Sequence, residues 1–413
     1  MSEKKNVPKL RFPEFTEPWE QRKLGEICDF ITKGATPTTY GFSWQPDGVP
    51  FFRNDSIKDN VFVFGEFSYI SEAANEVLKR SEVHGNDILI AITGDIGKVG
   101  IIPDTVEKAN INQHIARVRI RKEALPYFVY QYLASDDTQK EYQKIKTGLS
   151  MPQLSLEQVR DIVVKIPEFN EQGKIADCLR RIDTLITLHQ RKYEKLVNIK
   201  KSMLDKMFPP NGASVPEIRF KGFTDPWEQR KLGEIAKEVV RNDPASDAPI
   251  MMITAGNGFI EQSDRYAFNN AGESLKKYIL LECGELAYNH GASKLRPYGS
   301  CFALTTVEKA RIPFVYHCFS VEKSNPEFLS IELNGANVEN QLRKIVSSGA
   351  RMDGLLNIAY SEYTEVTVQL PKKEEQDWIA KFFKQLDTLI TLHQRKLEKL
   401  QNIKKSCLEK MFV

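Results

Sequence analysis

The amino-acid sequence predicts an α+β fold in which two mixed α/β domains are joined by two long helices packed as an antiparallel coiled coil. The first observation is an internal repeat: residues 7–27, which include Trp19, recur with few changes as residues 215–235. The second is that residues 171–208 recur as residues 375–412. Repeats of this length indicate an architecture before any residue is given a role. They predict a pseudo-two-fold arrangement of the two halves of the chain.

The third observation is that the stretches between the repeats, residues 28–165 and 236–370, have diverged. By contrast, the decapeptide at 183–192 is identical to the decapeptide at 387–396. A shared frame that holds two different inserts is typical of a protein that recognises two different things in one geometry. Because the inserts are similar in length, we expect them to share a fold.

The bulk composition is that of a globular protein with several domains. A chain of 413 residues is too long for one hydrophobic core. Its hydrophobic content of 41% is ordinary, and no apolar run reaches the length of a membrane span. The six cysteines are scattered, which argues against a zinc ribbon or a disulfide framework. We therefore expect a cytoplasmic protein without a membrane segment.

The formal net charge of the chain is only +3. Proteins that hold nucleic acid alone usually carry a stronger basic excess, because phosphate contacts supply much of the affinity. Any binding of DNA by this chain therefore needs a localised basic face, or a partner that adds one.

Residues 171–208 and 375–412 each predict one long helix. Apolar residues recur in each at alternating intervals of four and three, as in a heptad stripe. Neither proline nor glycine interrupts residues 174–208. At a rise of about 1.5 Å per residue, each helix would be about 50 Å long. The simplest prediction is that the two stripes pack on each other; the alternative is that each stripe serves a separate oligomer.

The inserts are predicted to mix strands with helices. The strand candidates are short apolar runs between turn residues, at 87–92, 99–102, 115–120 and 162–166 in the first insert and at 249–254, 278–281, 286–288 and 365–370 in the second. One helix is expected at 126–145, and 326–346 should also contain helix. Residues 209–216, rich in proline, form the linker that ends the first long helix.

The sequence contains no recognisable catalytic motif. It has no phosphate loop, no His-Glu-x-x-His and no Gly-x-Ser-x-Gly. Residues 94–100 resemble a nucleotide loop only superficially, and a tight turn between strands explains them better. His189 and His393 lie on the helix stripes without a set of metal ligands, so we expect core polar residues near the helix crossing. The prediction is a reader or scaffold with no catalytic residue, no metal and no cofactor.

Several polar loops suit contact with DNA. Asn, Gln, Arg and Lys side chains fit major-groove base edges, whereas Ser, Thr and Lys more often hold phosphates. For any single residue an ordinary solvated loop is the alternative, so the prediction concerns the loops together. In the first insert the candidate DNA-binding residues are Lys33, Thr36, Thr38, Tyr40, Arg53, Asn54, Lys98, Asn110, Asn112, Gln113, His114, Lys146, Ser150 and Gln153. In the second insert they are Asn289, His290, Ser293, Lys294, Arg296, Tyr298, Arg343, Lys344, Ser348 and Arg351.

The repeated frame motif around Trp19 and Trp227 has a structural explanation. The same residues stand beside two unlike inserts. We therefore expect these large rings to dock each insert onto the long helices rather than to stack on bases.

Together these features resemble the specificity subunit of a type I restriction-modification enzyme, and the resemblance covers nearly the whole chain. The motifs that carry it are Trp19-Glu-Gln-Arg-Lys-Leu-Gly-Glu26, Gly34-Ala-Thr-Pro37 to Gly48-Val-Pro-Phe51, Gly94-x-x-Gly-Lys-Val-Gly100, Asn110-Ile-Asn-Gln-His114 and Glu171-Gln-x-x-Ile-Ala176. The second insert has no copy of Gly-Ala-Thr-Pro or Asn-Ile-Asn-Gln-His, which suggests a dissimilar second half-site.

The resemblance implies a non-catalytic subunit that reads a bipartite double-stranded DNA target. It implies target-recognition domains at 1–168 and 211–372, with spacer helices at 169–210 and 373–413. Two adenine-methylating modification subunits would bind along the helices, and two ATP-dependent restriction subunits would join them to cut DNA. The alternative from the residues alone is a coiled-coil scaffold or adaptor whose two variable domains bind proteins or glycans. An autonomous nuclease is less consistent with the sequence, which shows no cluster of metal-binding carboxylates.

Overall fold

The computed structural model describes residues 6–65, 67–148, 152–210, 212–265, 272–346 and 356–412. The chain divides into two compact units. The first unit comprises Met1–Gln190 together with Arg395–Val413, and the second comprises Arg191–Gln394. Each unit therefore contains one insert and one half of each long helix, and we describe each by itself.

The two long helices are α5 (Phe169–Lys206) and α9 (Lys373–Met411). Both predicted helices are confirmed, with bounds within two residues of the repeated segments. Helix α5 ends just before the proline pair at 209–210, because proline cannot donate the backbone hydrogen bond that would continue a helix. None of the described helices combines the length and the apolar character that a membrane crossing requires.

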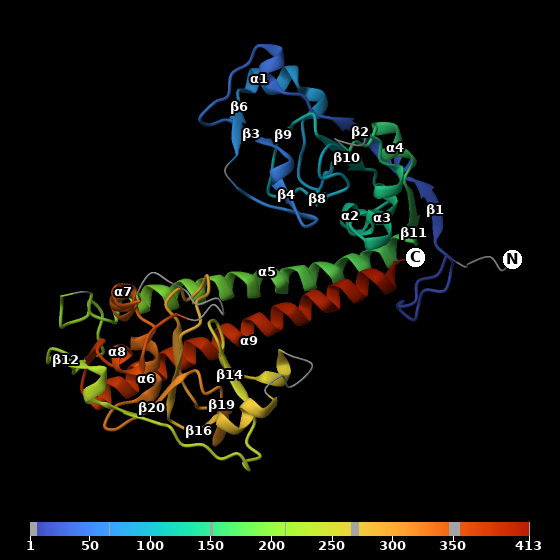
Figure 1. Ribbon diagram of the computed structural model, residues 1–413. Helices are drawn as coiled ribbons and strands as arrows, with labels where there is room; N and C mark the ends of the chain where they lie inside the picture. The colour runs from blue at the N-terminus through green and yellow to red at the C-terminus, as the bar shows by residue number, and fades with distance from the viewer. Residues whose placement is uncertain are drawn as a thin grey trace. The chain divides into compact units, whose positions relative to one another are not determined.

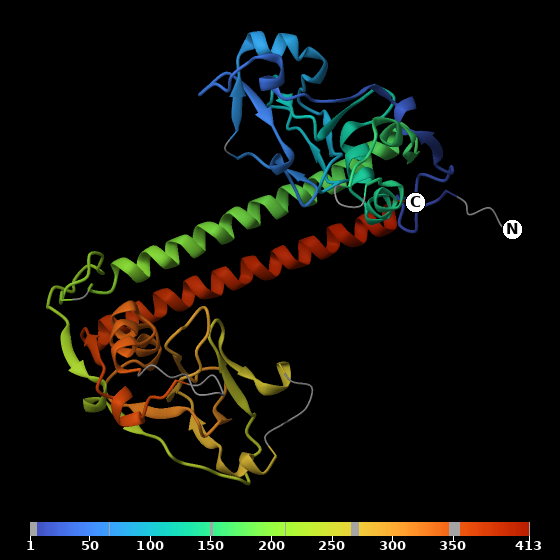
Figure 2. The same cartoon turned by 45° about the horizontal axis from the view of Figure 1, so that its top comes forward.

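The halves of α5 and α9 in the first unit run in opposite directions (Figures 1 and 2). Phe412, at the end of α9, contacts Trp19, whose indole Nε1 donates to Glu171 near the start of α5 at 3.3 Å. Moving away from this end, Lys404 of α9 forms an ion pair with Asp183 of α5 at 2.8 Å. Residue numbers thus rise along one helix while they fall along the other.

The second unit repeats this arrangement with the two helices exchanged. Phe208, just after α5, contacts Trp227 and Phe383. Lys200 of α5 forms an ion pair with Asp387 of α9 at 2.5 Å, at the positions equivalent to Lys404 and Asp183. The predicted antiparallel packing and the pseudo-two-fold repeat are therefore both confirmed.

A four-stranded antiparallel sheet forms the centre of the first insert. Its strand order is β2 (Cys28–Lys33), β10 (Ile115–Ile120), β7 (Ile88–Ala91) and β8 (Val99–Ile101). Strand β7 is buried along its whole length, as its unbroken apolar sequence predicts. The predicted turn at 94–100 is confirmed as the connection between β7 and β8. Smaller sheets pair β1 (Glu20–Lys23) with β11 (Val163–Ile166), β4 (Ile57–Lys58) with β5 (Val61–Phe62), and β3 (Val49–Phe52) with both β6 (Ser68–Ile70) and β9 (Asn110–Ile111).

The helices of the first insert are α1 (Glu72–Val77), α2 (Pro126–Leu133), α3 (Asp136–Ile145) and α4 (Leu156–Asp161). The prediction of a single helix at 126–145 was wrong, because the chain breaks between α2 and α3. Ser135 adopts an extended conformation with φ −66° and ψ 149°. Its hydroxyl donates to the carbonyl of Tyr132 at 2.7 Å, so it competes with the helical hydrogen bonds.

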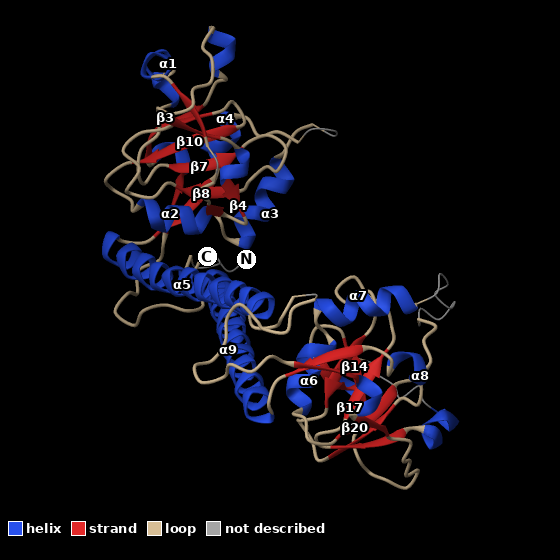
Figure 3. Cartoon of the chain, turned by 90° about the vertical axis from the view of Figure 1, so that its left-hand side faces the viewer, coloured by secondary structure: helices blue, strands red, loops and turns tan. Residues whose placement is uncertain are grey.

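The second insert has a central sheet of the same strand order: β13 (Ala236–Glu238), β20 (His317–Val321), β17 (Leu286–Asn289) and β18 (Ser300–Ala303). Flanking pairs are β12 (Glu228–Lys231) with β21 (Thr367–Leu370), β14 (Met251–Thr254) with β15 (Gly258–Glu261), and β16 (Ile279–Glu282) with β19 (Lys309–Ile312). The helices are α6 (Pro326–Leu333), α7 (Ala336–Ile345) and α8 (Tyr360–Tyr363). Figure 3 shows this mixture of strands and short helices in both inserts. The expectation of a shared fold holds for the central sheets, for the pairs β1–β11 and β12–β21 and for the helix pairs α2–α3 and α6–α7, while the remaining small sheets differ.

The frame docks each insert onto the long helices in the same way. Trp19 and Trp227 are only 2% and 4% exposed, and both lie in the hydrophobic cores. Arg11 holds Glu171 of α5 through two hydrogen bonds, and Arg219 holds Glu375 of α9 in the same way. The structural role predicted for the frame motif is confirmed.

Candidate nucleic-acid interface

Gly34 brings two of the predicted loops of the first insert together. It directly follows β2, and a Cβ atom at this position would lie 1.9 Å from the carbonyl oxygen of Ile111. No side chain fits in that space, so only glycine allows the loop after β2 to press against the loop after β9. The close approach explains the glycine that begins the Gly-Ala-Thr-Pro motif.

The polar side chains of these two loops then bind each other. The hydroxyl of Thr36 donates to Oε1 of Gln113 at 2.5 Å. The amide nitrogen of Gln113 donates to Nε2 of His114 at 3.1 Å. Asn112 anchors the second loop, since its backbone N–H donates to the carbonyl of Phe52 in β3 and its Oδ1 accepts from the backbone of His114. The result is an ordered row of polar groups, of which Gln113 is exposed.

Backbone hydrogen bonds join three further loops to this row. The N–H of Ile92 donates to the carbonyl of His114, and the N–H of Leu154 donates to the carbonyl of Ile92, both at 2.9 Å. The N–H of Gly94 donates to the carbonyl of Pro152 at 3.1 Å. The side-chain amide of Asn54 donates to the carbonyl of Thr93 at 3.0 Å. Loops that the sequence separates by more than a hundred residues thus meet at one edge of the sheets.

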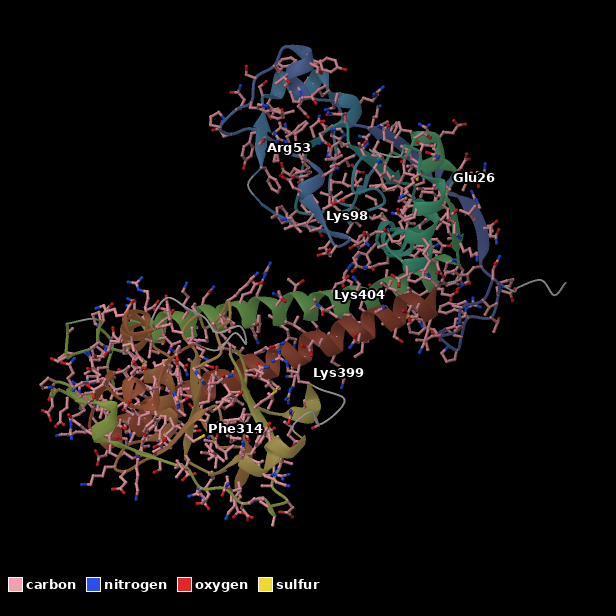
Figure 4. The ribbon with its side chains drawn as sticks, viewed as in Figure 1. Glu26, Arg53, Lys98, Phe314, Lys399 and Lys404 are labelled. Atoms are coloured by element: carbon pink, nitrogen blue, oxygen red, sulfur yellow. The ribbon has the colours of Figure 1, made fainter. Side chains whose placement is uncertain are left out.

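The remaining candidates of the first insert lie on its surface. Lys98, in the turn between β7 and β8, pairs with Asp95 at 2.7 Å, and its side chain is 37% exposed. In Figure 4, Arg53 and Lys98 lie toward the left of this unit, away from Glu26 of the frame at its right. Five other candidates are exposed and lie outside the core: Lys33, Thr38, Tyr40, Lys146 and Gln153.

Asn110 must be removed from the set of DNA-contacting candidates. It is 0% exposed, and its amide groups are occupied by Ser81, Asn75 and the carbonyl of Leu78. A base could reach this side chain only if the core opened. Asn110 instead ties β9 to the segment around α1.

Two candidates of the second insert also have structural roles. His290 is 7% exposed, and its ring nitrogens lie 2.8 and 2.7 Å from the carbonyl oxygens of Leu356 and Val315. Arg296 turns inward and donates to the carbonyl of Asn334 at 2.7 Å, and burial lowers the pKa of its guanidinium. His290 is not available to a duplex on the surface, so its assignment was wrong. Arg296 is half-buried with one hydrogen-bonded nitrogen, and its assignment stays a prediction.

The other candidates of the second insert form a less connected set. Asn289 is partly buried and donates to the carbonyl of Ile253, while Tyr298 accepts through its carbonyl from the hydroxyl of Tyr288. Exposed candidates are Ser293, Lys294, Arg343 and Lys344. Ser150, Ser348 and Arg351 lie outside the described residues. The structure therefore gathers the first insert's candidates at one edge and leaves those of the second more scattered.

Sequence reasoning missed Trp44 and Ser68, both of which hold the side chain of Arg53. The guanidinium carbon of Arg53 lies 4.8 Å from the centre of the Trp44 ring, and its Nη2 donates to the hydroxyl of Ser68 at 2.8 Å. A tryptophan within the polar segment Gly41-Phe-Ser-Trp-Gln45 was the available signal. The sequence does not show that Arg53 is the partner of this tryptophan, because the pairing of β3 with β6 brings these segments together.

The described residues show little that could support catalysis. They contain no group of three His, Cys, Asp or Glu side chains placed to hold a metal. Burial raises the pKa of Cys28 and of Cys301 to about 12, so both thiols stay protonated at neutral pH. A protonated thiol is a poor nucleophile. The polar edge of the first insert is thus equipped for hydrogen bonding.

Comparisons with known proteins identify the family. Residues 16–198 and 224–402 match the type I restriction modification DNA specificity domain. The MjaX specificity subunit of a type I restriction enzyme from Methanocaldococcus jannaschii is 23% identical over 97% of this chain and 94% of its own length. The EcoBI specificity subunit from Escherichia coli is 29% identical over 44% of this chain and 38% of its own.

A solved structure agrees in fold. The crystal structure of a type I restriction-modification system S subunit from M. genitalium superposes with a TM-score of 0.63, at 14% identity, over 98% of this chain and 99% of that one. The two family matches each cover one insert together with most of the helix that follows it. With both halves of the chain matched, the protein belongs to the type I restriction modification DNA specificity family.

Proposed function

We propose that this chain is the sequence-specific DNA recognition subunit of a type I restriction-modification complex, and that each insert reads one half of a bipartite target. The observation that carries the proposal is that the repeated frame, residues 7–27 and 171–208 with their copies, holds two inserts whose polar loops differ. The same Arg–Glu pairs and buried tryptophans dock both inserts. The reading loops differ: the second insert has no copy of Gly34-Ala-Thr-Pro37 or of Asn110-Ile-Asn-Gln-His114, although the two central sheets have the same strand order.

A further repeated contact supports the division into frame and insert. The side chain of Gln172 accepts from the backbone of Leu125 and donates to the carbonyl of Pro167. Gln376 makes the equivalent pair of bonds. Because the frame is tied to the start of α2 or α6 by the same polar contact, an insert can change its surface loops without changing its docking. We propose that the domains run as first expected, with inserts at 1–168 and 211–372 and spacer helices at 169–210 and 373–413.

The family works in complexes with DNA and with methylase and restriction subunits, and we propose two copies of each subunit here. Leu185 and Leu188 on α5 are 43% and 45% exposed, and their equivalents on α9, Leu389 and Leu392, are 42% and 45% exposed. Equivalent apolar positions on both helices would give two equivalent binding surfaces for two modification subunits. These subunits would also supply phosphate contacts that a chain of net charge +3 lacks.

The complex would act on DNA in the cytoplasm, and the chain itself would direct adenine methylation and cleavage by its partners without catalysing either. The helices would hold the two inserts apart, so that the bases between the half-sites remain unread. The length of α5, 38 residues at about 1.5 Å each, bounds this spacing.

The test is an exchange of one insert. Residues 236–370 are replaced by the corresponding insert of another family member, and methylated adenines are mapped by sequencing in a host that carries the modification subunit. We expect one half-site to change and the other to persist. If both half-sites changed, modular reading would be refuted. If the purified complex showed no preference for any DNA sequence, a scaffold for other partners would be the better explanation.

A further inference from the structure

Arg53 lies at the polar edge of the first insert. It directly follows β3, and its backbone is extended with φ −125° and ψ 179°. Its neighbour Asn54 binds the carbonyl of Thr93, which places Arg53 beside the loops joined by Gln113 and His114. Its side chain is exposed, and it forms no ion pair among the described residues. Among the described residues, therefore, no carboxylate neutralises the charge of its guanidinium.

Trp44 supports the guanidinium from one side. The guanidinium carbon lies 4.8 Å from the centre of the Trp44 ring, within the range of a cation–π contact. The ring is itself held edge-to-face against Phe51 at 5.1 Å, and Phe51 is 2% exposed. The next residue, Gln45, donates its backbone N–H to the carbonyl of Tyr69 at 2.9 Å. The loop that carries Trp44 is thus fastened to the sheet.

Ser68 holds the plane of the guanidinium at a set orientation through a hydrogen bond. Nη2 of Arg53 donates to the Ser68 hydroxyl at 2.8 Å. Ser68 belongs to β6 and lies opposite Phe51 of β3 in the antiparallel pair. An aromatic face and a hydroxyl, both anchored in one small sheet, therefore set the orientation of a long side chain that would otherwise sample many rotamers.

We propose that Arg53 reads a guanine in the first half-site, with Trp44 and Ser68 as positioning residues; this inference rests on the proposed function. Beyond the bond to Ser68, no described residue accepts a hydrogen bond from the Nη1–H groups or from the second Nη2–H. Two such parallel donors match O6 and N7 of guanine in the major groove. A phosphate contact needs only a positive charge, whereas reading a base edge needs a guanidinium plane held at a set angle. The fixed plane is what Trp44 and Ser68 provide.

The experiment uses the full chain assembled with its modification subunits. The target is first mapped from methylated adenines in the host, and binding is then measured on duplexes in which each base pair of the first half-site is replaced in turn. For the wild-type complex we expect discrimination of about 5- to 150-fold in favour of guanine at one position. Arg53→Lys and Arg53→Gln should both lose discrimination at that position and retain it at the others.

Trp44→Ala should weaken the same discrimination, and Trp44→Phe should restore part of it, because a phenyl face still supports the guanidinium. Arg22→Gln is the matched control, since Arg22 is a frame arginine paired with Glu26, and it should change nothing. The variants could instead lose affinity for all duplexes equally, with a slope of log affinity against log salt concentration that is lower by about one. That result would identify Arg53 as a phosphate contact and overturn the inference. Unchanged discrimination in both Arg53 variants would also overturn it. A wild-type complex without any sequence preference would instead refute the proposed function.

Discussion

Phe412, the penultimate residue of the chain, completes the core of the first unit, so its loss should loosen a unit built mainly from the opposite end of the sequence. Its side chain is 8% exposed, and its ring lies 6.1 Å from Trp19, 5.4 Å from Phe128 and 5.7 Å from Tyr132. A phenylalanine buried to this extent typically costs about 3–5 kcal/mol when cut back to alanine. That is a large part of the roughly 5–15 kcal/mol by which a domain is stable.

The matched variant is Phe208→Ala, because Phe208 fills the equivalent place in the second unit beside Trp227, Phe328 and Phe383. Hydrogen exchange followed by mass spectrometry reads both units in one sample. We expect Phe412→Ala to accelerate exchange in α2 and in the β1–β11 pair, and Phe208→Ala to accelerate it in α6 and in the β12–β21 pair. Phe314→Ala is the control, since that ring is 48% exposed and its loss should cost about 0.5 kcal/mol or less (Figure 4).

The reasoning would be refuted if Phe412→Ala accelerated exchange in the second unit alone, or in both units to the same degree. It would also be refuted if Phe412→Ala behaved like Phe314→Ala. Either result would mean that the end of α9 does not belong to the core of the first unit.

Three further predictions follow from other parts of the chain. Gly34→Ala should abolish reading of the first half-site in a methylation map and leave the second intact, because its Cβ would collide with the carbonyl of Ile111 at 1.9 Å; an unchanged map would contradict the close approach. Glu332 is 3% exposed, and burial raises its pKa to about 7, above the 4.5 of an unfolded chain. The folded state therefore favours the protonated form, and stability should fall by up to about 3 kcal/mol as pH rises from 4.5 to 7. Urea unfolding of Glu332→Gln should show a smaller fall than wild type over this range, and an equal fall would refute the burial argument. Insertion of four residues after Leu196 should lengthen the unread spacer in the methylated target without changing either half-site; altered half-sites would count against helices that set the spacing.

The sequence by itself determined the elements that depend on local pattern. Heptad stripes that neither proline nor glycine interrupts after Gly173 specify α5 and α9 to within two residues of the predicted bounds. Short apolar runs bounded by turn residues, such as 115–120, specify strands, because this pattern is also local. The duplication also predicted that α5 and α9 pack on each other, since two copies of one apolar stripe can bury each other. The antiparallel direction followed from placing the second insert at the far end of the first helix.

Only the tertiary structure decided which polar residues remain available to a partner. Asn110 and Gln113 are near neighbours in one motif, yet the first is buried in a hydrogen-bonded core position and the second is exposed. Burial depends on what other segments of the chain pack against a residue, and no local pattern records those segments. For the same reason, the sequence did not predict the contact between Arg53 and Trp44, or the packing of Phe412 against Trp19 in the core of the first unit. Such contacts join distant parts of the chain, because the free energy of folding is gained by burying surface wherever the fold brings it together.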